Sequence, residues 1–368
     1  MTRTLRRSVR RGLTWASAAA IIVAAVIGSG VIPIASSGHW RVTSTLLDFV
    51  KRRSVALRAA PLTAPDLTVP SLVDLGAAHY EAGCRPCHGR PGLVLPLVPR
   101  RMTPHPPDLQ RQVGRWSAEE LFYLVKHGIK FTGMPAWAYA DRDDEVWAVV
   151  AFVRRLPSLD GPAYERMTAL GTARPAAASD VEQAARESCE RCHGAGGLGR
   201  GLVPRLAGQR ATYLRDALDA YASGARRSGI MGPVAASLRA NEVATLGAYY
   251  AALAPMAPEA PMAPERESGD AAKTLTSREL GASIAAAGRA DQDVPACSVC
   301  HPTGAAATVN PAFPRIAGLA AEYVELQLRL FAESRRGGGP FAGVMREVAT
   351  GLTAEQRRHV AVYYASER

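Results

Sequence analysis

The feature that most constrains this chain is a Cys-x-x-Cys-His motif that occurs three times in 368 residues. The motifs read "CRPCH", "CERCH" and "CSVCH", and together they contain every cysteine of the sequence: Cys84, Cys87, Cys189, Cys192, Cys297 and Cys300. No cysteine is left over for a structural disulfide, so all six serve one chemistry. A repeated motif indicates a repeated structural unit, and each copy is expected to head its own.

A second pattern follows each motif, a methionine with an aromatic side chain eighteen residues after it. The pairs are Met134 with Phe152, Met231 with Tyr249, and Met345 with Tyr363. The segments around the aromatics have the apolar spacing of helices, and no segment alternates convincingly as a strand does. The sequence therefore predicts an all-α fold built from three units. Their expected bounds are 72–160 (unit 1), 178–254 (unit 2) and 273–368 (unit 3).

The segment between units 2 and 3, residues 255–272, is rich in proline and alanine. Such a composition predicts a semi-extended spacer that does not pack. Units of this size are marginal as independent cores. A large apolar cofactor inside each unit would help to stabilise it.

Three chemistries use a Cys-x-x-Cys pair. Structural zinc needs four ligands per site, and three identical pairs do not divide into complete four-cysteine sites. A thioredoxin-like pair needs a βαβ setting and no histidine. Covalent haem attachment uses both thiols, which add to the two vinyl groups, and places the histidine under the iron. The sequence therefore predicts three covalent haems c, with proximal ligands His88, His193 and His301.

The repeated methionines are candidates for the sixth ligand of each iron. A thioether ligand stabilises reduced iron and raises its potential. A single methionine is often core filler, but three in register with the same aromatic favour ligation by Met134, Met231 and Met345. In unit 1, His105 or His127 offers bis-histidine ligation as the alternative. The remaining histidines considered are expected at the surface or the membrane interface: His39, His79 and His359.

The net charge of +11 suggests a polyanion-binding protein until the charges are located. Residues 1–60 carry ten basic side chains and one acidic side chain, which accounts for +9 of the total. The rest of the chain is close to neutral. A nucleic-acid partner is therefore not expected.

Residues 12–38 contain no charged side chain and follow a basic head. A helix needs about 20 apolar residues to cross a bilayer, so 1–38 is expected to be a cytoplasmic flank and transmembrane anchor. A cleaved signal peptide with a site near Ala35 is the alternative, although its apolar region normally spans about 7–15 residues. Residues 39–71 are expected to form an amphipathic juxtamembrane segment and linker. Its basic face would lie on the outer leaflet or dock on a partner subunit, or the segment is a solvated stalk.

The motifs and the residues that follow them resemble class I c-type cytochromes. Units 2 and 3, with "CHG…PRLAGQ…YL…M…AYY" and "VPACSVCH…PRIAG…Y…M…VYY", are similar to the two halves of dihaem cytochromes of the c-four type. Unit 1, with "HGIKFTGMPAW", resembles single-haem membrane-anchored cytochromes, and Gly76 and Tyr80 match their packing positions in the first helix.

The resemblance implies further site residues. Pro204 and Pro314 would offer their carbonyls to the proximal histidines, which is the outer partner that metal-bound histidines need. Arg205 and Arg315 would face haem propionates. In unit 1, Pro99 stands at the same offset as Pro204, and the prolines of "TPHPPDL" compete with it.

The resemblance also implies a location and a role. Family members receive haem outside the cytoplasmic membrane, which implies an inner-membrane anchor and haem units in the bacterial periplasm. The implied function is electron carriage without catalysis, from a quinol-oxidising complex or dehydrogenase to a terminal oxidase or periplasmic acceptor. An electron-acceptor subunit of a membrane-bound alcohol or sugar dehydrogenase is the alternative. A haem peroxidase needs an open sixth position, which three methionines in register disfavour.

Overall fold

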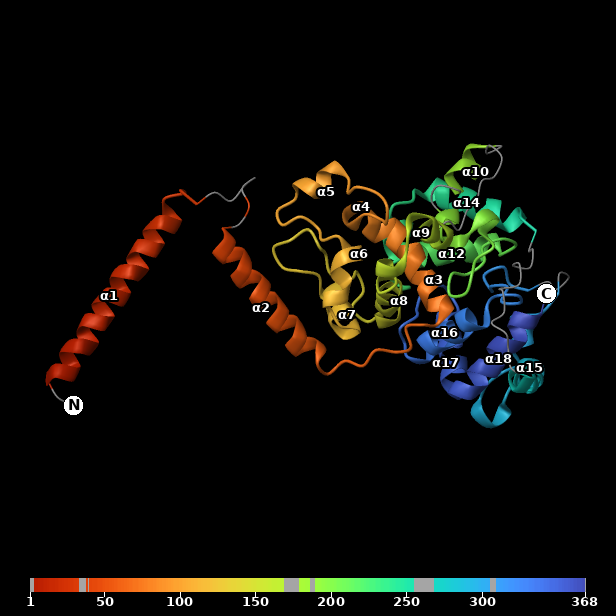
Figure 1. Ribbon diagram of the computed structural model, residues 1–368. Helices are drawn as coiled ribbons and strands as arrows, with labels where there is room; N and C mark the ends of the chain where they lie inside the picture. The colour runs from red at the N-terminus through yellow and green to blue at the C-terminus, as the bar shows by residue number, and fades with distance from the viewer. Residues whose placement is uncertain are drawn as a thin grey trace.

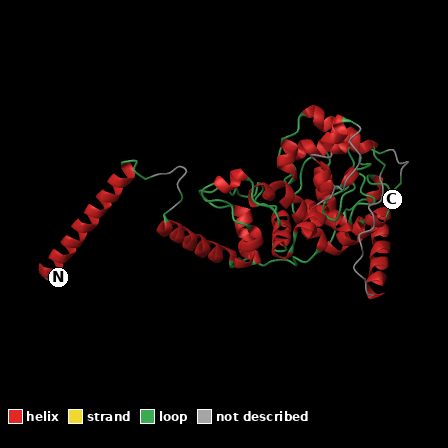
Figure 2. Ribbon diagram, turned by 45° about the horizontal axis from the view of Figure 1, so that its top comes forward, coloured by secondary structure: helices red, strands yellow, loops and turns green. Residues whose placement is uncertain are grey.

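The computed structural model describes residues 3–32, 38, 40–168, 179–185, 189–254, 268–304 and 309–367. Regular structure in these ranges is helical, as Figure 2 shows. Two isolated bridges, Arg200–Val203 and Arg289–Val294, are the extended pairs among the described residues. The described part of the chain therefore has the all-α architecture that the periodicity predicts.

The first helix, α1 (Arg3–Gly28), stands apart from the other helices in Figure 1. Its stretch from Arg10 to Gly28 is long and apolar enough to cross a membrane, and a signal sequence near an N-terminus meets the same description. The helix ends ten residues before the predicted limit of 38. Gly30 follows with a φ of 72°, a conformation that glycine adopts without strain. Residues 33–37 and 39 lie outside the described residues.

Helix α2 (Arg41–Ala59) covers part of the predicted juxtamembrane segment and packs beside α7 (Ala118–His127). Val55 and Ala59 are buried in this contact. Arg52 lies over the Trp116 ring, 5.1 Å from its centroid. The sequence-based alternatives placed this segment on a leaflet, on a partner or in solvent. Part of its surface packs on unit 1 of its own chain, a contact that these expectations did not include, and Val42 and Phe49 are exposed.

Unit 1 is built around the crossing of α3 (Pro70–His79) and α8 (Asp143–Val153). A Cβ added at Gly76 would lie 2.0 Å from the carbonyl oxygen of Ala148, so the two backbones approach this closely because residue 76 is glycine. Short helices complete the unit: α4 (Arg85–His88), α5 (Leu97–Arg101) and α6 (Leu109–Gln112). A π-helical turn, η1 (Tyr80–Cys84), joins α3 to the first motif.

Unit 1 extends beyond its predicted end at 160. Helix α9 (Gly161–Thr168) carries Tyr164, which is fully buried with Tyr80 and Phe152 in the core of the unit. The Tyr164 hydroxyl donates a hydrogen bond to Glu81, with an oxygen–oxygen distance of 2.6 Å. The chain after residue 160 turns back, and α9 packs on α3.

Unit 2 contains α10 (Asp180–Ala185), α11 (Arg191–His193), α12 (Ala211–Ala222), α13 (Met231–Ala236) and α14 (Ala240–Ala252). Unit 3 contains α15 (Ser268–Ala287), α16 (Ala321–Ala332), α17 (Ala342–Gly351) and α18 (Ala354–Ser366). Short turns occur in all three units: η2 (Val113–Arg115) and η3 (Leu156–Ser158) in unit 1, η5 (Ala195–Gly197) in unit 2, and η6 (Ala290–Gln292) and η7 (Cys297–Val299) in unit 3.

Helix α15 begins inside the predicted spacer 255–272. The helix starts at Ser268. No proline occurs between Pro264 and the end of the helix at Ala287, and this segment is rich in helix-favouring alanine. Gly281 lets α15 cross α18 closely, since an added Cβ would lie 2.1 Å from the carbonyl oxygen of His359. Unit 3 therefore repeats the glycine-mediated crossing of unit 1.

Candidate functional site

A connected cavity of about 2720 Å³ runs through all three units. Small-molecule pockets usually have volumes of about 300–1,000 Å³, so this volume corresponds to several cofactor sites joined together. Its lining includes the three motif histidines, the three repeated methionines and five of the six motif cysteines, with Cys297 outside the lining set. The structure thus brings residues from distant parts of the chain around one continuous space.

Each motif histidine is held by a proline carbonyl. The Nδ1 atom of His193 lies 2.7 Å from the oxygen of Pro204, and that of His301 lies 2.9 Å from the oxygen of Pro314. A carbonyl oxygen only accepts, so Nδ1 carries the hydrogen and Nε2 keeps its lone pair. Metal-binding histidines are oriented in this way by their outer partners.

The corresponding acceptor in unit 1 is Pro107. The Nδ1 atom of His88 lies 3.1 Å from its oxygen. The repeated offset had singled out Pro99, which instead lies buried in α5. The longer unit 1 loop brings a proline of "TPHPPDL" to the histidine, so the function is kept while the spacing changes.

Burial controls the protonation of these side chains. It lowers the pKa of His88, His193 and His301, and the proline carbonyls oppose that effect. A neutral imidazole is the form that binds metals. Burial raises the pKa of Cys84 to about 12 and that of Cys189 to about 11. Neutral thiols in an apolar wall suit a large organic cofactor.

The methionines reach the cavity from three different local settings. Met134 follows a tight turn, and its backbone N–H donates to the Thr132 hydroxyl at 3.1 Å. Met231 is the first residue of α13, and Met345 lies in α17. Other candidates also line the cavity in unit 1: Met102, His105 and His127. Met102 has no aromatic residue eighteen positions after it, yet its Cε would lie 2.2 Å from a Cβ added at Gly133, beside Met134.

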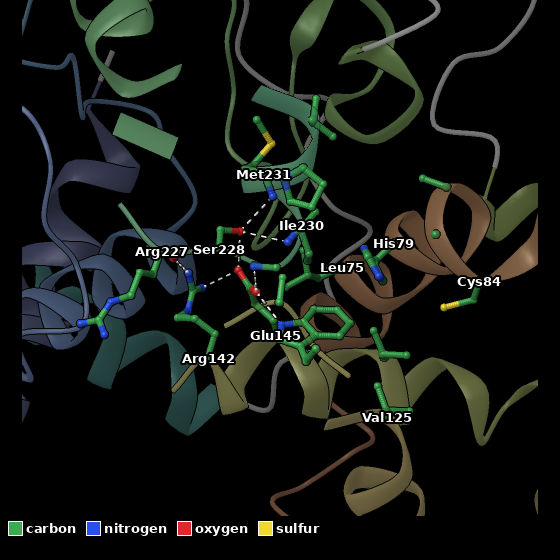
Figure 3. A pocket seen from close by; sticks show the side chains of 18 of the residues that line it. Leu75, His79, Cys84, Val125, Arg142, Glu145, Arg227, Ser228, Ile230 and Met231 are labelled. Atoms are coloured by element: carbon green, nitrogen blue, oxygen red, sulfur yellow. Dashed lines mark hydrogen bonds and ion pairs between the residues drawn. The ribbon is translucent and has the colours of Figure 1, made fainter. Parts of the chain in front are cut away.

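His79 was expected at the surface, but the structure places it in the cavity wall (Figure 3). Its ring meets Trp137 edge to face, with centroids 4.7 Å apart. Desolvation lowers its pKa to about 4. Periodicity places His79 on helix α3 but does not show that Trp137, 58 residues later, covers it.

The two predicted propionate partners have different settings. Arg205 lines the cavity and donates to the carbonyl oxygen of Ala317 at 2.8 Å. Arg315 is not among the lining residues. Its backbone N–H and C=O instead pair with the Gln209 side chain at 2.8 and 2.9 Å, which joins unit 2 to unit 3.

Two arginines that the sequence did not single out lie in the cavity wall between units 2 and 3. Arg226 is buried and donates to Tyr213, Tyr323 and Gln327. Arg336 donates to Gln327 at 2.6 Å and to Tyr213 at 3.2 Å. Within the part of the chain that the structure describes, no carboxylate is recorded in an ion pair with either. Buried charges need a counter-charge, and the propionates of a haem would supply it, so the residues present fit that group.

Two segments of the chain match known family models. Residues 71–153 match the model described as cytochrome C oxidase, cbb3-type, subunit III, and residues 178–249 match the model described as cytochrome c.

Curated relatives cover about half of the chain. The thiosulfate dehydrogenase electron acceptor of Thiomonas intermedia (strain K12) is 37% identical over 184 residues, which are 49% of this chain and 78% of that protein. Cytochrome c4 of Thiocapsa roseopersicina is 34% identical over 186 residues, which are 50% of this chain and 88% of that protein. The solved cytochrome c4 of Acidithiobacillus ferrooxidans superimposes with a TM-score of 0.40 at 29% identity, over 49% of this chain and 99% of that one.

Proposed function

Because the chain belongs to the c-type cytochromes and is an electron-transfer protein, we propose that it carries three covalent haems c on one membrane-anchored chain. The observation that carries this proposal is the repeated arrangement around the cavity. In each unit a motif histidine with a proline acceptor, a methionine and at least one motif cysteine face the same space.

The chain's own residues have defined tasks in this proposal. The cysteine thiols of each motif would form the covalent links. The Nε2 atom of His88, His193 or His301 and the sulfur of Met134, Met231 or Met345 would be the protein ligands of the iron. Bound haem supplies a one-electron centre, whose potential the axial ligands and their surroundings tune. The apolar cavity wall keeps water from the site.

We propose further that the carrier takes electrons from a periplasmic dehydrogenase or a quinol-oxidising complex. It would deliver them to a terminal oxidase or another periplasmic acceptor. The name of the Thiomonas relative favours one donor class, a thiosulfate-oxidising dehydrogenase, over the alcohol or sugar dehydrogenases considered from the sequence. Helix α1 would hold the units at the periplasmic face of the inner membrane. Retention of the protein in carbonate-washed membranes would support the anchor, and release would favour a cleaved signal.

The haem assignment predicts a definite stoichiometry and ligation. Pyridine haemochrome analysis should give three covalent haems per chain. Replacement of Met134, Met231 or Met345 by alanine should each remove about a third of the near-infrared sulfur-to-iron band, since each site contributes one such ligand. Met167→Leu is the matched control, because Met167 packs against the core of unit 1 and does not line the cavity. Two haems per chain would contradict the stoichiometry. An unchanged band in one alanine variant would contradict the ligand assignment for the unit of that methionine.

The donor is tested with the oxidised full-length protein and purified donors. Rapid reduction by thiosulfate with a thiosulfate dehydrogenase, but not by thiosulfate alone, would support that donor class. Reduction by a quinol-oxidising complex, with no reduction by the thiosulfate dehydrogenase, would support the quinol-oxidising complex as the donor. Hydrogen-peroxide turnover at enzymatic rates would reject a role restricted to electron carriage.

A further inference from the structure

A carboxylate of unit 1 is buried inside the contact with unit 2. Glu145, in α8, is 2% exposed. It accepts hydrogen bonds from the Ser228 hydroxyl at 2.5 Å and from the Gly229 backbone N–H at 2.7 Å, both in unit 2. The Trp137 indole N–H, in unit 1, donates to the same carboxylate at 3.1 Å. Figure 3 shows Ser228 and Arg142 pointing toward Glu145.

Arg142 supplies a positive charge beside Glu145 within the contact. An Nη2 atom of Arg142 lies 3.0 Å from Glu145 and 2.8 Å from Asp144. Another Arg142 nitrogen donates to the carbonyl oxygen of Arg227, so the guanidinium also bridges the two units. A buried carboxylate with this many donors is a fixed part of the structure, because removing a partner leaves an uncompensated polar group.

Ser228 connects this carboxylate to the backbone of Met231. Its hydroxyl donates to Glu145 and accepts from the backbone N–H groups of Met231 at 3.0 Å and Ile230 at 3.2 Å. One hydrogen and two lone pairs are all that a hydroxyl offers, so its orientation is set. Two hydrogen bonds therefore connect a unit 1 carboxylate to Met231, which lines the cavity in unit 2.

The same segment of unit 2 is pressed against the loop that bears the unit 1 methionine. A Cβ added at Gly229 would lie 2.2 Å from the Trp137 indole nitrogen, and one added at Gly232 would lie 3.0 Å from the Tyr139 ring. Trp137 follows Met134 by three residues. The two methionine-bearing loops thus touch each other, with glycines at the points of closest approach.

We propose that Glu145 positions the Met231 segment, so that the docking of unit 1 strengthens methionine ligation in unit 2. The proposal rests on Met231 being the sixth ligand of unit 2, as proposed above, and adds the residue that holds it. Glu145 acts through Ser228 and touches neither the methionine sulfur nor the reacting iron.

Glu145→Gln keeps the size of the side chain and removes its ability to accept on both sides. An amide has one carbonyl oxygen, so its NH₂ group must face either the donors Gly229 and Trp137 or the donors Ser228 and Arg142. Imidazole, which competes with methionine for the iron, reports the strength of ligation. In the full-length haem-loaded protein, Glu145→Gln should tighten imidazole binding at one of three sites by about tenfold, the equivalent of one lost hydrogen bond. That site should also show a lower reduction potential.

Ser228→Ala breaks the same connection from the unit 2 side and should give the same shift at the same site. The double variant should not add the two effects, because both remove one path. Asp74→Asn is the matched control. It breaks a different ion pair between these units, the one between Asp74 and Arg200 at 2.6 Å, and leaves the Met231 segment untouched. It should leave imidazole binding unchanged.

Met231→Ala identifies the site and separates the two proposals. If this variant leaves the near-infrared band unchanged, the ligand assignment fails. If it removes part of the band while Glu145→Gln and Ser228→Ala behave like Asp74→Asn, the ligand stands and the positioning role of Glu145 is overturned. Should Glu145→Gln fail to fold, the comparison of Ser228→Ala with Asp74→Asn decides the question.

Discussion

At the scale of the residue, burial decides which side chains carry charge in this protein. The motif histidines keep a neutral ring because the cavity wall disfavours their charged form. His79 shows the same effect, since desolvation by burial is the cause of its lowered pKa. A neutral histidine in the wall makes the stability of unit 1 depend on pH.

We expect His79→Leu, a change of similar volume, to flatten that dependence. The pKa of His79 is lowered from 6.5 to about 4 in the folded protein. Between these values the unfolded chain binds a proton that the folded chain does not. The contribution of neutral His79 to the free energy of unfolding is therefore fully present above pH 6.5. It is lost as the pH decreases towards 4, by up to about 3 kcal/mol.

Calorimetry of the full-length protein at pH 7 and pH 4.5 measures this effect on the unit 1 transition. The wild-type protein should lose more stability than the variant between the two values. Equal losses would mean that another group carries the pH dependence.

At the scale of the element, two close helix crossings depend on glycine. Helices α3 and α8 meet at Gly76, and α15 and α18 meet at Gly281. In both, the space that a Cβ would need is occupied by a backbone carbonyl of the partner helix. Backbone cannot rotate away as a flexible side chain does, so the crossing angle and distance depend on the absence of a side chain.

Gly76→Ala and Gly281→Ala should each destabilise their own unit. Overpacking in a close contact costs about 1–3 kcal/mol and occasionally more, which corresponds to a fall in Tm of roughly 4–8 °C per kcal/mol in a unit of this size. Gly343→Ala is the control, because Gly343 lies in α17 with nothing within 4 Å of an added Cβ. It should be neutral or stabilising by about 0.5–1 kcal/mol. A crossing variant with the Tm of the control would contradict the close approach.

At the scale of the whole molecule, polar contacts join the three units around the shared cavity. Unit 1 meets unit 2 through Glu145 and Ser228. Unit 2 meets unit 3 through Arg226, whose guanidinium bonds to Tyr213 of unit 2 and to Tyr323 of unit 3. These contacts place positive charge inside the assembly, next to the proposed redox centres.

Arg226→Gln should lower the reduction potentials of units 2 and 3. A buried positive charge disfavours the oxidised, more positive iron, so its removal stabilises the oxidised state. Arg215→Gln is the control, since the Arg215 side chain is 53% exposed and solvent screens its charge. Spectroelectrochemical titration measures both variants. Equal potentials in the Arg226 variant and the control would show that the guanidinium does not face the redox centres.

Local patterns in the sequence were sufficient for the class of the fold and for the candidate ligands. The motif spacing and the helical periodicity involve residues on one helix or one loop, and the methionine-to-aromatic register involves elements that follow each other in the chain. They placed His193, Pro204 and Met231 in one unit. In the structure these residues line one cavity, and the His193 ring is hydrogen-bonded to the carbonyl oxygen of Pro204. Patterns of this kind are visible because their period is set by the local geometry of a helix.

The tertiary structure decided the features that depend on which segments meet. It selected Pro107 over Pro99, added α9 to unit 1, packed α2 on its own chain, and brought Glu145 to Ser228. The hydrogen bond of His88 joins residues 19 positions apart, and that of Glu145 joins residues 83 positions apart. No periodicity marks them, because side-chain packing and the pairing of buried polar groups are determined only after distant helices have come together.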